Sequence, residues 1–481
     1  MGDEVALTTF TREDRQRYRD KVKLCLDVFA RMLAEARFDP DRRSIGLEIE
    51  LNLTEETGDP ALANQHVLEL IADDDFQTEL GQFNIEINIP PRKLQGSVFR
   101  ETEETVRRDL NHAEEQAAKA HAHMMIIGIL PTLTEELLNG EALSANPRYK
   151  LLNEQIFAAR GEDLSINISG VERLAILADT IAPEAACTSV QLHQIVDPAA
   201  FGAHWNAAQA IAGIQLAIGA NSPFFFGREL WRETRIALFE QTTDTRPEEL
   251  KAQGVRPRVW FGERWITSIF DLFEENVRYF PALLPVVEDE DPVAVLESGG
   301  TPRLQELRLH NGTVYRWNRP IYDVARDRPH LRVENRVLPA GPTIVDTMAN
   351  AAFYYGLVRV LVEDERPIWT QMSFSAAHDN FLAGARDGID ARVYWPGVGE
   401  VPATELVVRR LLPMAREGLA RWEVDAADAD RLLEIIERRC VDQVNGASWQ
   451  AAAFHRLYER LDRQDALREM TVRYREHMHS N

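Results

Sequence analysis

Apolar and polar residues alternate with a period of two over residues 46–53, and this pattern predicts a β-strand with one buried face. Glu48, Glu50 and Asn52 fall on one face of that strand, while leucine and isoleucine side chains form the other. Residues 82–89 repeat the pattern, and carboxylate and amide side chains again share one face. The sequence therefore predicts two strands that are apolar on one side and rich in oxygen atoms on the other.

Two later segments, residues 188–196 and 331–338, follow the same pattern less regularly. In the first, a glutamine and a histidine share the polar side before the alternation is interrupted. In the second, a single glutamate stands between two arginines of the same face. The polar side chains in question are Gln191, His193, Arg332, Glu334 and Arg336.

Neighbouring carboxylates on one strand face repel each other, by about 3 kcal/mol for charges about 5 Å apart at an effective dielectric constant near 20. A solvated strand face is the simpler explanation for one such pair, because half-buried antiparallel strands are common. The first two strands, however, have no lysine on their polar faces and offer only carboxylate and amide oxygens, the ligands of hard cations such as Mg²⁺. With imidazole and guanidinium groups on the later strands, the shared face is expected to hold metal ions together with an anionic ligand.

Long connections that contain helices separate these strands, which predicts an α+β fold rather than a doubly wound nucleotide-binding fold. Neither a P-loop sequence nor the glycine-rich dinucleotide fingerprint occurs. Pro90 and Pro91 are expected to end the second strand, and a short apolar strand is predicted over residues 124–130. Helices are predicted over residues 11–37, 97–122, 146–159, 197–219 and 343–362.

The last part of the chain, from about residue 403, is predicted to be almost entirely helical, with amphipathic segments near residues 424–440 and 448–478. We expect residues 1–400 to form a domain built on the sheet. Residues 401–481 are expected to form a helical extension that packs on this domain.

A basic segment at residues 303–319 is the candidate for binding phosphate. Arg308, Arg316 and Arg319 flank a turn expected at residues 311–312, and guanidinium groups are natural bidentate partners of phosphate and carboxylate oxygens. The alternative is a set of surface arginines, because this chain uses arginine more often than lysine. Composition alone does not separate the two interpretations.

The chain has 481 residues, of which 45% are hydrophobic and 27% are charged, an ordinary composition for a globular protein. With a formal charge of −23 it lacks the basic patch of a nucleic-acid-binding protein, so no nucleic-acid partner is expected. No long apolar run or export signal is present, and we expect a cytoplasmic protein without membrane contact. Cys25, Cys187 and Cys440 are widely spaced, which argues against a disulfide framework or a zinc site, and Cys187 is expected to be a small buried residue rather than a nucleophile.

Five short sequence segments between residues 44 and 340 are informative both in their content and in their order along the chain. They are Gly46–Glu50, Glu79–Glu86, Asn146–Lys150, Ala220–Pro223 and Glu334–Arg336. Together they resemble the glutamate-cysteine ligase family, within the carboxylate-amine ligase superfamily that includes glutamine synthetase. The resemblance implies a glutamine synthetase-like catalytic domain followed by the C-terminal helical extension. Its sheet is expected to be curved and mainly antiparallel, with a polar concave active-site face and helices on the other face.

The same resemblance implies the reaction. Such enzymes use ATP as a co-substrate to convert the γ-carboxylate of glutamate into a γ-glutamyl phosphate, which the amine of cysteine then attacks. Two or more Mg²⁺ ions are the implied cofactors, with Mn²⁺ as a substitute. The expected partners are therefore small molecules, namely glutamate, ATP and cysteine or another amine.

By motif position, the resemblance implies two groups of metal ligands. The implied ligands are Glu50, Glu79 and Glu86 for the metal nearer the glutamate, and Glu48 and Glu334 for the metal on the ATP phosphates. Many relatives have a histidine ligand where this chain has Gln191. Either Gln191 or its same-face neighbour His193 is therefore the remaining ligand, and an amide oxygen also suits Mg²⁺.

The resemblance implies further roles around the metals. Arg336 is similar to the arginine that neutralises the transferring phosphoryl group, and Glu86 is expected to be essential for turnover. The candidates for nucleotide phosphates are Arg308, Arg316 and Arg319, and those for substrate contacts are Arg148, Tyr149 and Asn221.

Two alternatives stay open beside ligation to cysteine. One keeps the scaffold but changes the nucleophile to another amine, or to water, which would give a different ligase or an amide hydrolase. The other is a non-catalytic protein that binds nucleotides or amino acids on the same fold. The acids at every strand position argue against an idle site, because an idle site has no reason to keep like charges together.

Overall fold

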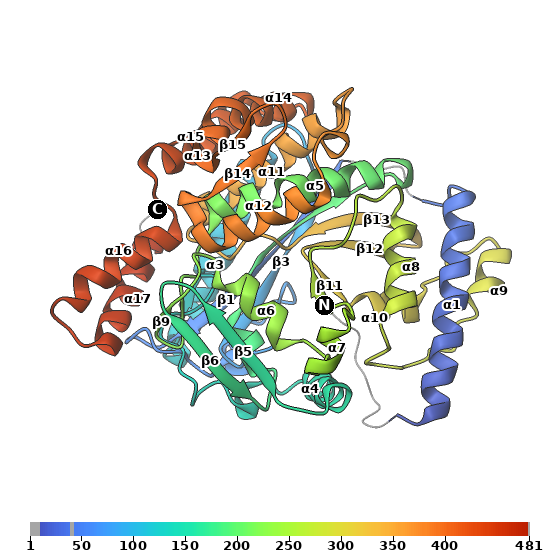
Figure 1. Ribbon diagram of the computed structural model, residues 1–481, viewed down its shortest axis with the longest axis horizontal. Coiled ribbons are helices and arrows are strands. Elements are labelled where there is room, and N and C mark those ends of the chain that lie inside the picture. The colour runs from blue at the N-terminus through green and yellow to red at the C-terminus, as the bar shows by residue number, and fades with distance from the viewer. Residues whose placement is uncertain (1–9, 39–42, 480–481) are drawn as a thin grey trace.

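The computed structural model describes residues 10–38 and 43–479 and is built around one curved sheet (Figure 1). Within these residues the sheet has seven strands, in the order β12-β13-β7-β1-β3-β2, and β4 pairs with the end of β1. Every neighbouring pair is antiparallel. The strands are β1 (Ser44–Thr54), β2 (Phe76–Thr78), β3 (Asn84–Lys93), β4 (His123–Met125), β7 (Val190–Ile195), β12 (Asn318–Ala325) and β13 (Arg328–Asn335).

The register of the sheet brings the predicted polar side chains to one face. Glu50 lies opposite Glu86, and Glu334 lies opposite His193. Paired residues of antiparallel strands point to the same side, so the four patterned segments share one polar face. The α+β fold with a curved antiparallel sheet is confirmed.

The strand ends differ from the sequence-based expectation. The expected stop at Pro90 and Pro91 is wrong, because β3 continues to Lys93. Leu47 pairs with Ile89 and Ile45 pairs with Arg92, so a bulge takes up both prolines. The strand expected over residues 124–130 is reduced to β4, and β13 ends before Arg336.

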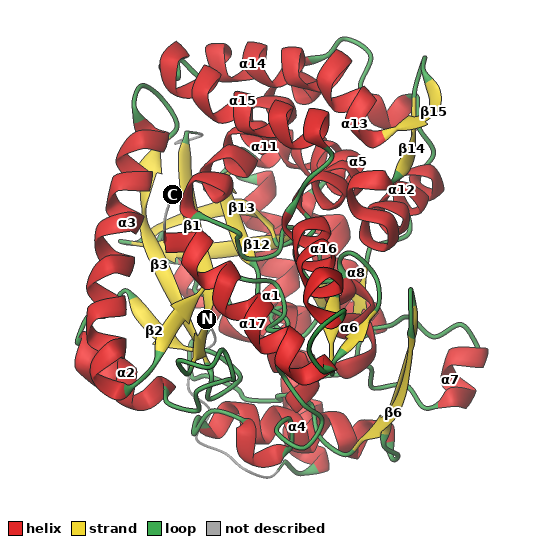
Figure 2. Ribbon diagram, turned by 90° about the vertical axis from the view of Figure 1, so that its left-hand side faces the viewer, coloured by secondary structure: helices red, strands yellow, loops and turns green. Residues whose placement is uncertain are grey.

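Three helices cover the apolar face of the sheet: α3 (Val98–Ala117), α5 (Phe201–Gly219) and α11 (Ile344–Glu363). Figure 2 shows α3 lying along the strands. Leucine and isoleucine side chains of β1 and β3 form one buried cluster with these helices. Nearly every residue of α5 is buried, which explains why this helix is apolar all round rather than amphipathic.

Two helices begin with common N-terminal capping patterns. Thr11 caps α1 (Arg12–Ala34) and forms a capping box with Asp14. Asn146 caps α4 (Pro147–Arg160), whose first residue is a proline that needs no hydrogen-bond partner for its nitrogen.

From residue 403 the chain is helical, as expected. The helices are α13 (Ala403–Leu406), a π-helical turn (Val407–Leu411), α14 (Leu412–Arg421), α15 (Ala426–Asp442), α16 (Gly446–Tyr458) and α17 (Arg463–His479). Helix α14 packs so closely on α11 that a Cβ atom on Gly418 would lie 1.7 Å from the carbonyl oxygen of Gly356. The division of the chain at residue 400 stays a prediction.

Helices α16 and α17 are attached to the sheet domain through buried polar groups. The nitrogen of Ala447 donates to the carbonyl oxygen of Ala220 (2.9 Å), and the Gln450 amide donates to Oδ1 of Asn221 (2.8 Å). Asn221 in turn donates to the Tyr474 hydroxyl of α17 (2.8 Å). Gly446 lies against Asn221 with no room for a side chain, because its Cβ would lie 1.9 Å from Oδ1.

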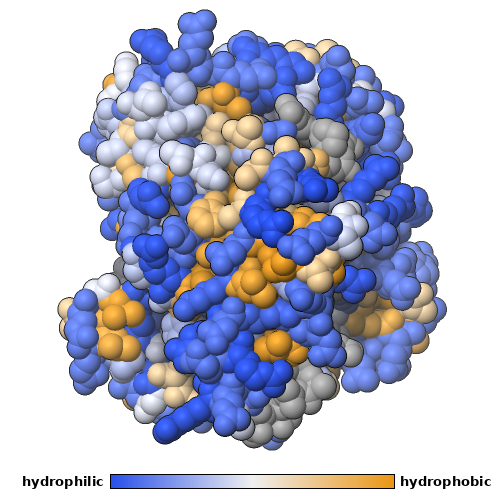
Figure 3. All heavy atoms as spheres, turned by 90° about the vertical axis from the view of Figure 1, so that its right-hand side faces the viewer, coloured by the Kyte–Doolittle hydropathy of each residue, from blue (hydrophilic) through white to orange (hydrophobic). Residues whose placement is uncertain are grey.

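The surface on the side of α1 and α9 (Pro292–Glu297) is largely hydrophilic, with an apolar area near its centre (Figure 3). None of the helices in residues 10–38 and 43–479 combines the length and the apolar character that crossing a membrane requires.

Candidate active site on the polar face of the sheet

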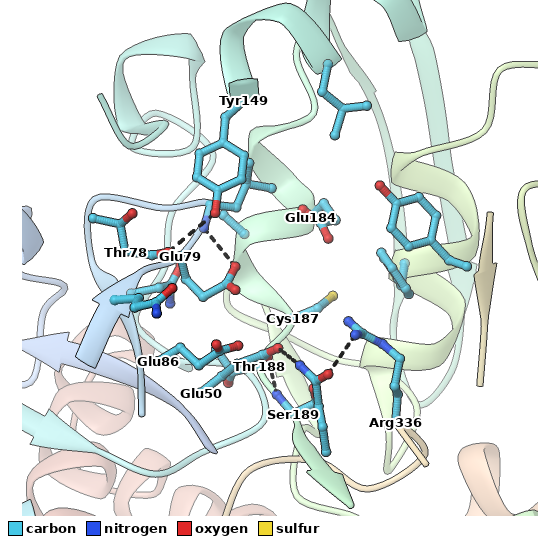
Figure 4. A pocket seen from close by; sticks show the side chains of 18 of the residues that line it. Glu50, Thr78, Glu79, Glu86, Tyr149, Glu184, Cys187, Thr188, Ser189 and Arg336 are labelled. Atoms are coloured by element: carbon cyan, nitrogen blue, oxygen red, sulfur yellow. Dashed lines mark hydrogen bonds between the residues drawn. The ribbon is translucent and has the colours of Figure 1, made fainter. Parts of the chain in front are cut away.

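A cavity on the polar face has a volume of about 220 Å³ (Figure 4). Strands β1, β3 and β7 form its floor, and its walls come from α4, the 3₁₀ helix Ala182–Ala186 and the segment around β11 (Tyr315–Arg316). The predicted site residues that line it are Glu50, Glu79, Glu86, Arg148, Tyr149, Gln191, Arg319 and Arg336.

Glu50, Glu79 and Glu86 form the tightest acidic group around the cavity. Glu50 and Glu86 are cross-strand neighbours, and Glu79 follows β2 in the turn that leads to β3. One carboxylate oxygen from each residue lies within 4.8 Å of the other two. The fold thus brings together carboxylate oxygens from three separate positions of the sequence.

Burial disfavours the charged form of all three carboxylates. It raises the pKa of Glu50 to about 7, of Glu79 to about 7 and of Glu86 to about 8, and the neighbouring carboxylates add to each shift. A proton or a cation must therefore compensate the group near neutral pH. Three convergent carboxylates with unmet negative charge fit a hard divalent cation.

Glu48, His193 and Glu334 form a second group beside the first. His193 Nε2 lies 3.0 Å from a carboxylate oxygen of Glu48, but in a direction that does not make a hydrogen bond. His193 Nδ1 accepts a hydrogen bond from Arg332 (3.1 Å). Because Nδ1 accepts, the proton of the neutral imidazole is on the buried Nε2 atom, which faces the carboxylate of Glu48.

The pKa values of this second group move the other way. Burial opposes ionisation of Glu48, yet His193 outweighs it and lowers the pKa of Glu48 to about 2. Burial also opposes ionisation of Glu334, but Arg319 and Arg336 hold its pKa well below the usual range. Neighbouring strand positions therefore carry carboxylates with opposite electrostatic environments.

Gln191 bridges the two groups. Its Oε1 accepts a hydrogen bond from Arg336 (2.8 Å), and its Nε2 donates to Glu50 (3.0 Å). The amide oxygen keeps a second lone pair, so its hydrogen bond with Arg336 does not exclude it as a metal ligand. Which of Gln191 and His193 is the remaining ligand stays a prediction.

The predicted phosphate-binding arginines fall into two places. Arg319 and Arg336 line the cavity and both donate to Glu334, at 2.8 Å and 2.7 Å. Arg308 is on helix α10 (Gln305–Asn311), before the expected turn, and forms an ion pair with Asp323 (2.9 Å). Arg316 is buried and forms an ion pair with Glu275 (2.8 Å).

Neither Arg308 nor Arg316 lines the cavity, and the structure does not bring them to the carboxylates. The guanidinium of Arg316 lies 5.0 Å from the ring of Trp260, and burial lowers its pKa. Their nucleotide-binding roles stay predictions.

The predicted substrate contacts also separate. Arg148 and Tyr149, at the start of α4, line the cavity. Asn221 is fully buried away from the cavity lining, where it connects α16 and α17 to the sheet domain. A structural role accounts for the contacts of Asn221.

Two charged residues that line the cavity were not among the site residues predicted from the sequence. Glu184 comes from the 3₁₀ helix Ala182–Ala186, which no periodicity reveals. Arg235 lies in the first turn of helix α6 (Thr234–Thr242), forms an ion pair with Glu233 (3.2 Å) and donates to the carbonyl oxygen of Val337. An arginine directly before the apolar run Ile236–Phe239 was the available signal for this residue.

Cys187 also lines the cavity, but burial and then the charge of Glu184 raise the pKa of its thiol. A raised pKa disfavours the thiolate that a nucleophile requires. Its environment therefore agrees with the expected role as a small, largely buried residue.

The fold resembles that of a known enzyme structure. A glutamate–cysteine ligase from Francisella tularensis, solved in complex with AMP, is similar in structure: the TM-score is 0.56 at 12% identity, over 92% of this chain and 90% of that chain. A bifunctional glutathione synthetase from Pasteurella multocida has a TM-score of 0.49 at 11% identity, over 95% of this chain and 55% of that chain. No curated protein matches the sequence.

Sequence comparison gives the more specific result. The model of the glutamate-cysteine ligase family 2 (GCS2) matches residues 44–469, which include every candidate site residue described above. This match covers most of the 481 residues. The chain therefore belongs to the glutamate-cysteine ligase family 2.

Proposed function

We propose that this carboxylate-amine ligase joins the γ-carboxylate of glutamate to the amine of cysteine, with ATP as co-substrate. The observation that carries the proposal is the meeting of the acidic group Glu50, Glu79 and Glu86 with Arg336 in one cavity of about 220 Å³. Carboxylates that need cations, placed beside guanidinium groups, suit a reaction in which phosphoryl oxygens gather charge.

The proposed reaction has two steps. An oxygen of the glutamate γ-carboxylate attacks the γ-phosphorus of ATP, and the bond to the leaving ADP breaks. The unprotonated amine of cysteine then attacks the acyl carbon, the new C–N bond forms, and phosphate leaves with the former carboxylate oxygen. The amine nitrogen loses one further proton, and the sum is one amide, ADP and phosphate.

Arg336 is the residue proposed to neutralise the transferring phosphoryl group. Burial disfavours its charge, but Glu334 and Glu50 raise the pKa of Arg336, so the guanidinium stays protonated. It is held by Glu334 and by the amide oxygen of Gln191. A cation fixed before the reaction costs little reorganisation when charge develops.

The two acidic groups fit divalent cations, with Mg²⁺ as the proposed ion and Mn²⁺ as a substitute. Glu50, Glu79 and Glu86 would hold one ion, and Glu48 and Glu334, with either Gln191 or His193, would hold the other. Such ions supply electrostatic stabilisation of phosphate oxygens and reduce the repulsion between ATP and the carboxylates. Arg319 is the cavity-lining candidate for the nucleotide phosphates, and Arg148 and Tyr149 are the candidates for substrate contacts.

The test is the dependence of ADP release on each component. Purified protein is incubated with ATP and Mg²⁺ while glutamate, cysteine or other amines are omitted or added in turn. The proposal predicts that ADP, phosphate and the γ-glutamyl amide form in equal amounts and only with the complete mixture.

Other outcomes identify the alternatives. Faster release with a different amine would replace cysteine as the acceptor but keep the ligase. Amide cleavage without ATP would favour a hydrolase. Binding of Mg²⁺ and ATP without turnover for any amine would favour a non-catalytic protein.

A further inference from the structure

Glu184 is a cavity-lining carboxylate that the proposed mechanism does not use. It lies in the 3₁₀ helix Ala182–Ala186, whose second residue is Pro183 and which precedes β7. Figure 4 shows its side chain on the wall of the cavity, separate from Glu50 and Glu86 on the floor. Its oxygens fall outside the group of three that can share one metal ion.

The arginines of the cavity do not neutralise Glu184. Four carboxylates and four arginines line the cavity within the described part of the chain. Three of these arginines are paired with carboxylates outside the lining. Arg235 pairs with Glu233 (3.2 Å), and both Arg319 (2.8 Å) and Arg336 (2.7 Å) pair with Glu334.

The side chain of Glu184 has no hydrogen bond and no ion pair with any residue in 10–38 and 43–479. A metal at the acidic group would compensate Glu50, Glu79 and Glu86 and would leave Glu184 as the remaining negative charge. Burial and then Glu79 and Glu50 raise the pKa of Glu184 to about 8. An unpaired, largely enclosed carboxylate of this kind is destabilising in its charged form unless a cation joins it, and otherwise it takes up a proton.

The surroundings of Glu184 suit an organic cation better than another metal ion. Tyr149 of α4 and Tyr315 of β11 line the same cavity, and the charge of Glu184 is among the causes that raise the pKa of both phenols. Tyrosine side chains near one carboxylate are typical of ammonium recognition. Among the described residues, Glu184 belongs to no group of three side chains that could share a metal ion.

We propose that Glu184 binds the ammonium group of an amino-acid substrate of this ligase. The inference rests on the proposed function. It assigns a role in substrate specificity to a residue that is neither a proposed metal ligand nor a proposed phosphate-binding residue. Two substrates carry an ammonium group, the donor glutamate and the acceptor amine. The carboxylate forms a charge-assisted hydrogen bond with either of them, and the experiment distinguishes the two sources.

The test compares Glu184→Gln, which keeps the shape and removes the charge, with Glu184→Asp, which keeps the charge at shorter reach. Glu240→Gln is the matched control, because burial raises the pKa of Glu240 to about 7 as well, but this residue does not line the cavity. Steady-state KM values are measured for glutamate, for cysteine and for glutarate, which lacks the ammonium group.

A donor ammonium at Glu184 predicts that Glu184→Gln raises KM for glutamate by about tenfold to a hundredfold, with KM for glutarate unchanged. An acceptor ammonium predicts the same rise for cysteine instead. Glu184→Asp should lose less than Glu184→Gln, and Glu240→Gln should match the wild type. KM values within twofold of the wild type for both substrates, or failure of both Glu184 variants to fold, would overturn the inference.

Calorimetric binding separates this inference from the proposed function. Glutamate and cysteine are titrated into the wild type and Glu184→Gln in the presence of Mg²⁺ and ADP, where no ligation occurs. A wild type without turnover would contradict the proposed function, while tenfold weaker binding of one amino acid to Glu184→Gln would still support the ammonium site. Equal binding to both proteins would overturn the ammonium site alone.

Discussion

At the residue scale, the most informative contrast is between Glu48 and Glu50, two residues apart on the same face of β1. Glu48 faces His193 and has a pKa lowered to about 2, against the effect of burial. Glu50 is buried beside Glu86 and has a pKa raised to about 7. The sheet thus provides one position that stays charged and one that needs a proton or a cation. If the proposed metal groups are correct, the boundary between them lies here.

Glu86→Gln tests the first metal group. Neutralising one of three convergent carboxylates should lower Mg²⁺-dependent kcat/KM at least about 100-fold, because the remaining two bind the cation more weakly. The melting temperature without Mg²⁺ should stay the same or rise, since repulsion from Glu48 and Glu79 is relieved. Turnover within tenfold of the wild type, with Glu240→Gln as control, would contradict the metal assignment.

Sequence periodicity predicted part of this site, for a physical reason. Glu48, Glu50 and Glu86 stand at alternate positions of half-buried strands, so their common face follows from the pleat alone. Glu184 and Arg235 come from a 3₁₀ helix and from the first turn of an α-helix, where local spacing does not encode direction toward a distant sheet. Their contribution depends on tertiary packing, which periodicity does not contain.

At the scale of elements, contacts between neighbouring strands and helices explain sequence features that local rules do not. The predicted end of β3 at Pro90 and Pro91 failed because a bulge accommodates both prolines. Similarly, Gly418 within α14 looks unfavourable for a helix, since glycine is a weak helix former. The close contact with Gly356 of α11 explains it, because only hydrogen fits there.

Gly418→Ala should therefore destabilise the protein although alanine favours helices. The new Cβ would meet backbone atoms 1.7 Å away, and the overpacking is expected to cost about 1–3 kcal/mol. Differential scanning calorimetry would record a lower melting temperature. The matched control is Gly140→Ala, whose Cβ meets nothing within 4 Å and which should behave like the wild type. Equal melting temperatures for both variants would contradict the tight contact of α11 with α14.

At the scale of the whole molecule, stability and metal binding should be linked through the buried carboxylates. Glu50, Glu79, Glu86 and Glu184 have folded-state pKa values of about 7 to about 8, above their ordinary value of 4.5. The folded protein therefore holds their protons more tightly than the unfolded chain does. Their contribution to stability is fully present below about pH 4.5 and is lost as the pH rises through about 8.

In a chelating buffer, the free energy of unfolding should accordingly fall between about pH 4.5 and about pH 8. Mg²⁺ should restore stability mainly at the upper end of this window, because a metal needs deprotonated ligands. Thermal melts across the window, with and without Mg²⁺, provide the measurement. A stabilisation by Mg²⁺ that is independent of pH, or one that Glu86→Gln retains in full, would be inconsistent with this linkage.

Activation of the substrate carboxylate by phosphorylation is the central claim for the whole enzyme, and oxygen transfer tests it most directly. Glutamate labelled with ¹⁸O in its γ-carboxylate is converted in the presence of ATP, Mg²⁺ and cysteine, and the released phosphate is analysed by mass spectrometry. The two-step reaction predicts that one ¹⁸O atom moves from each activated carboxylate into phosphate. Formation of the γ-glutamyl amide with unlabelled phosphate would contradict it.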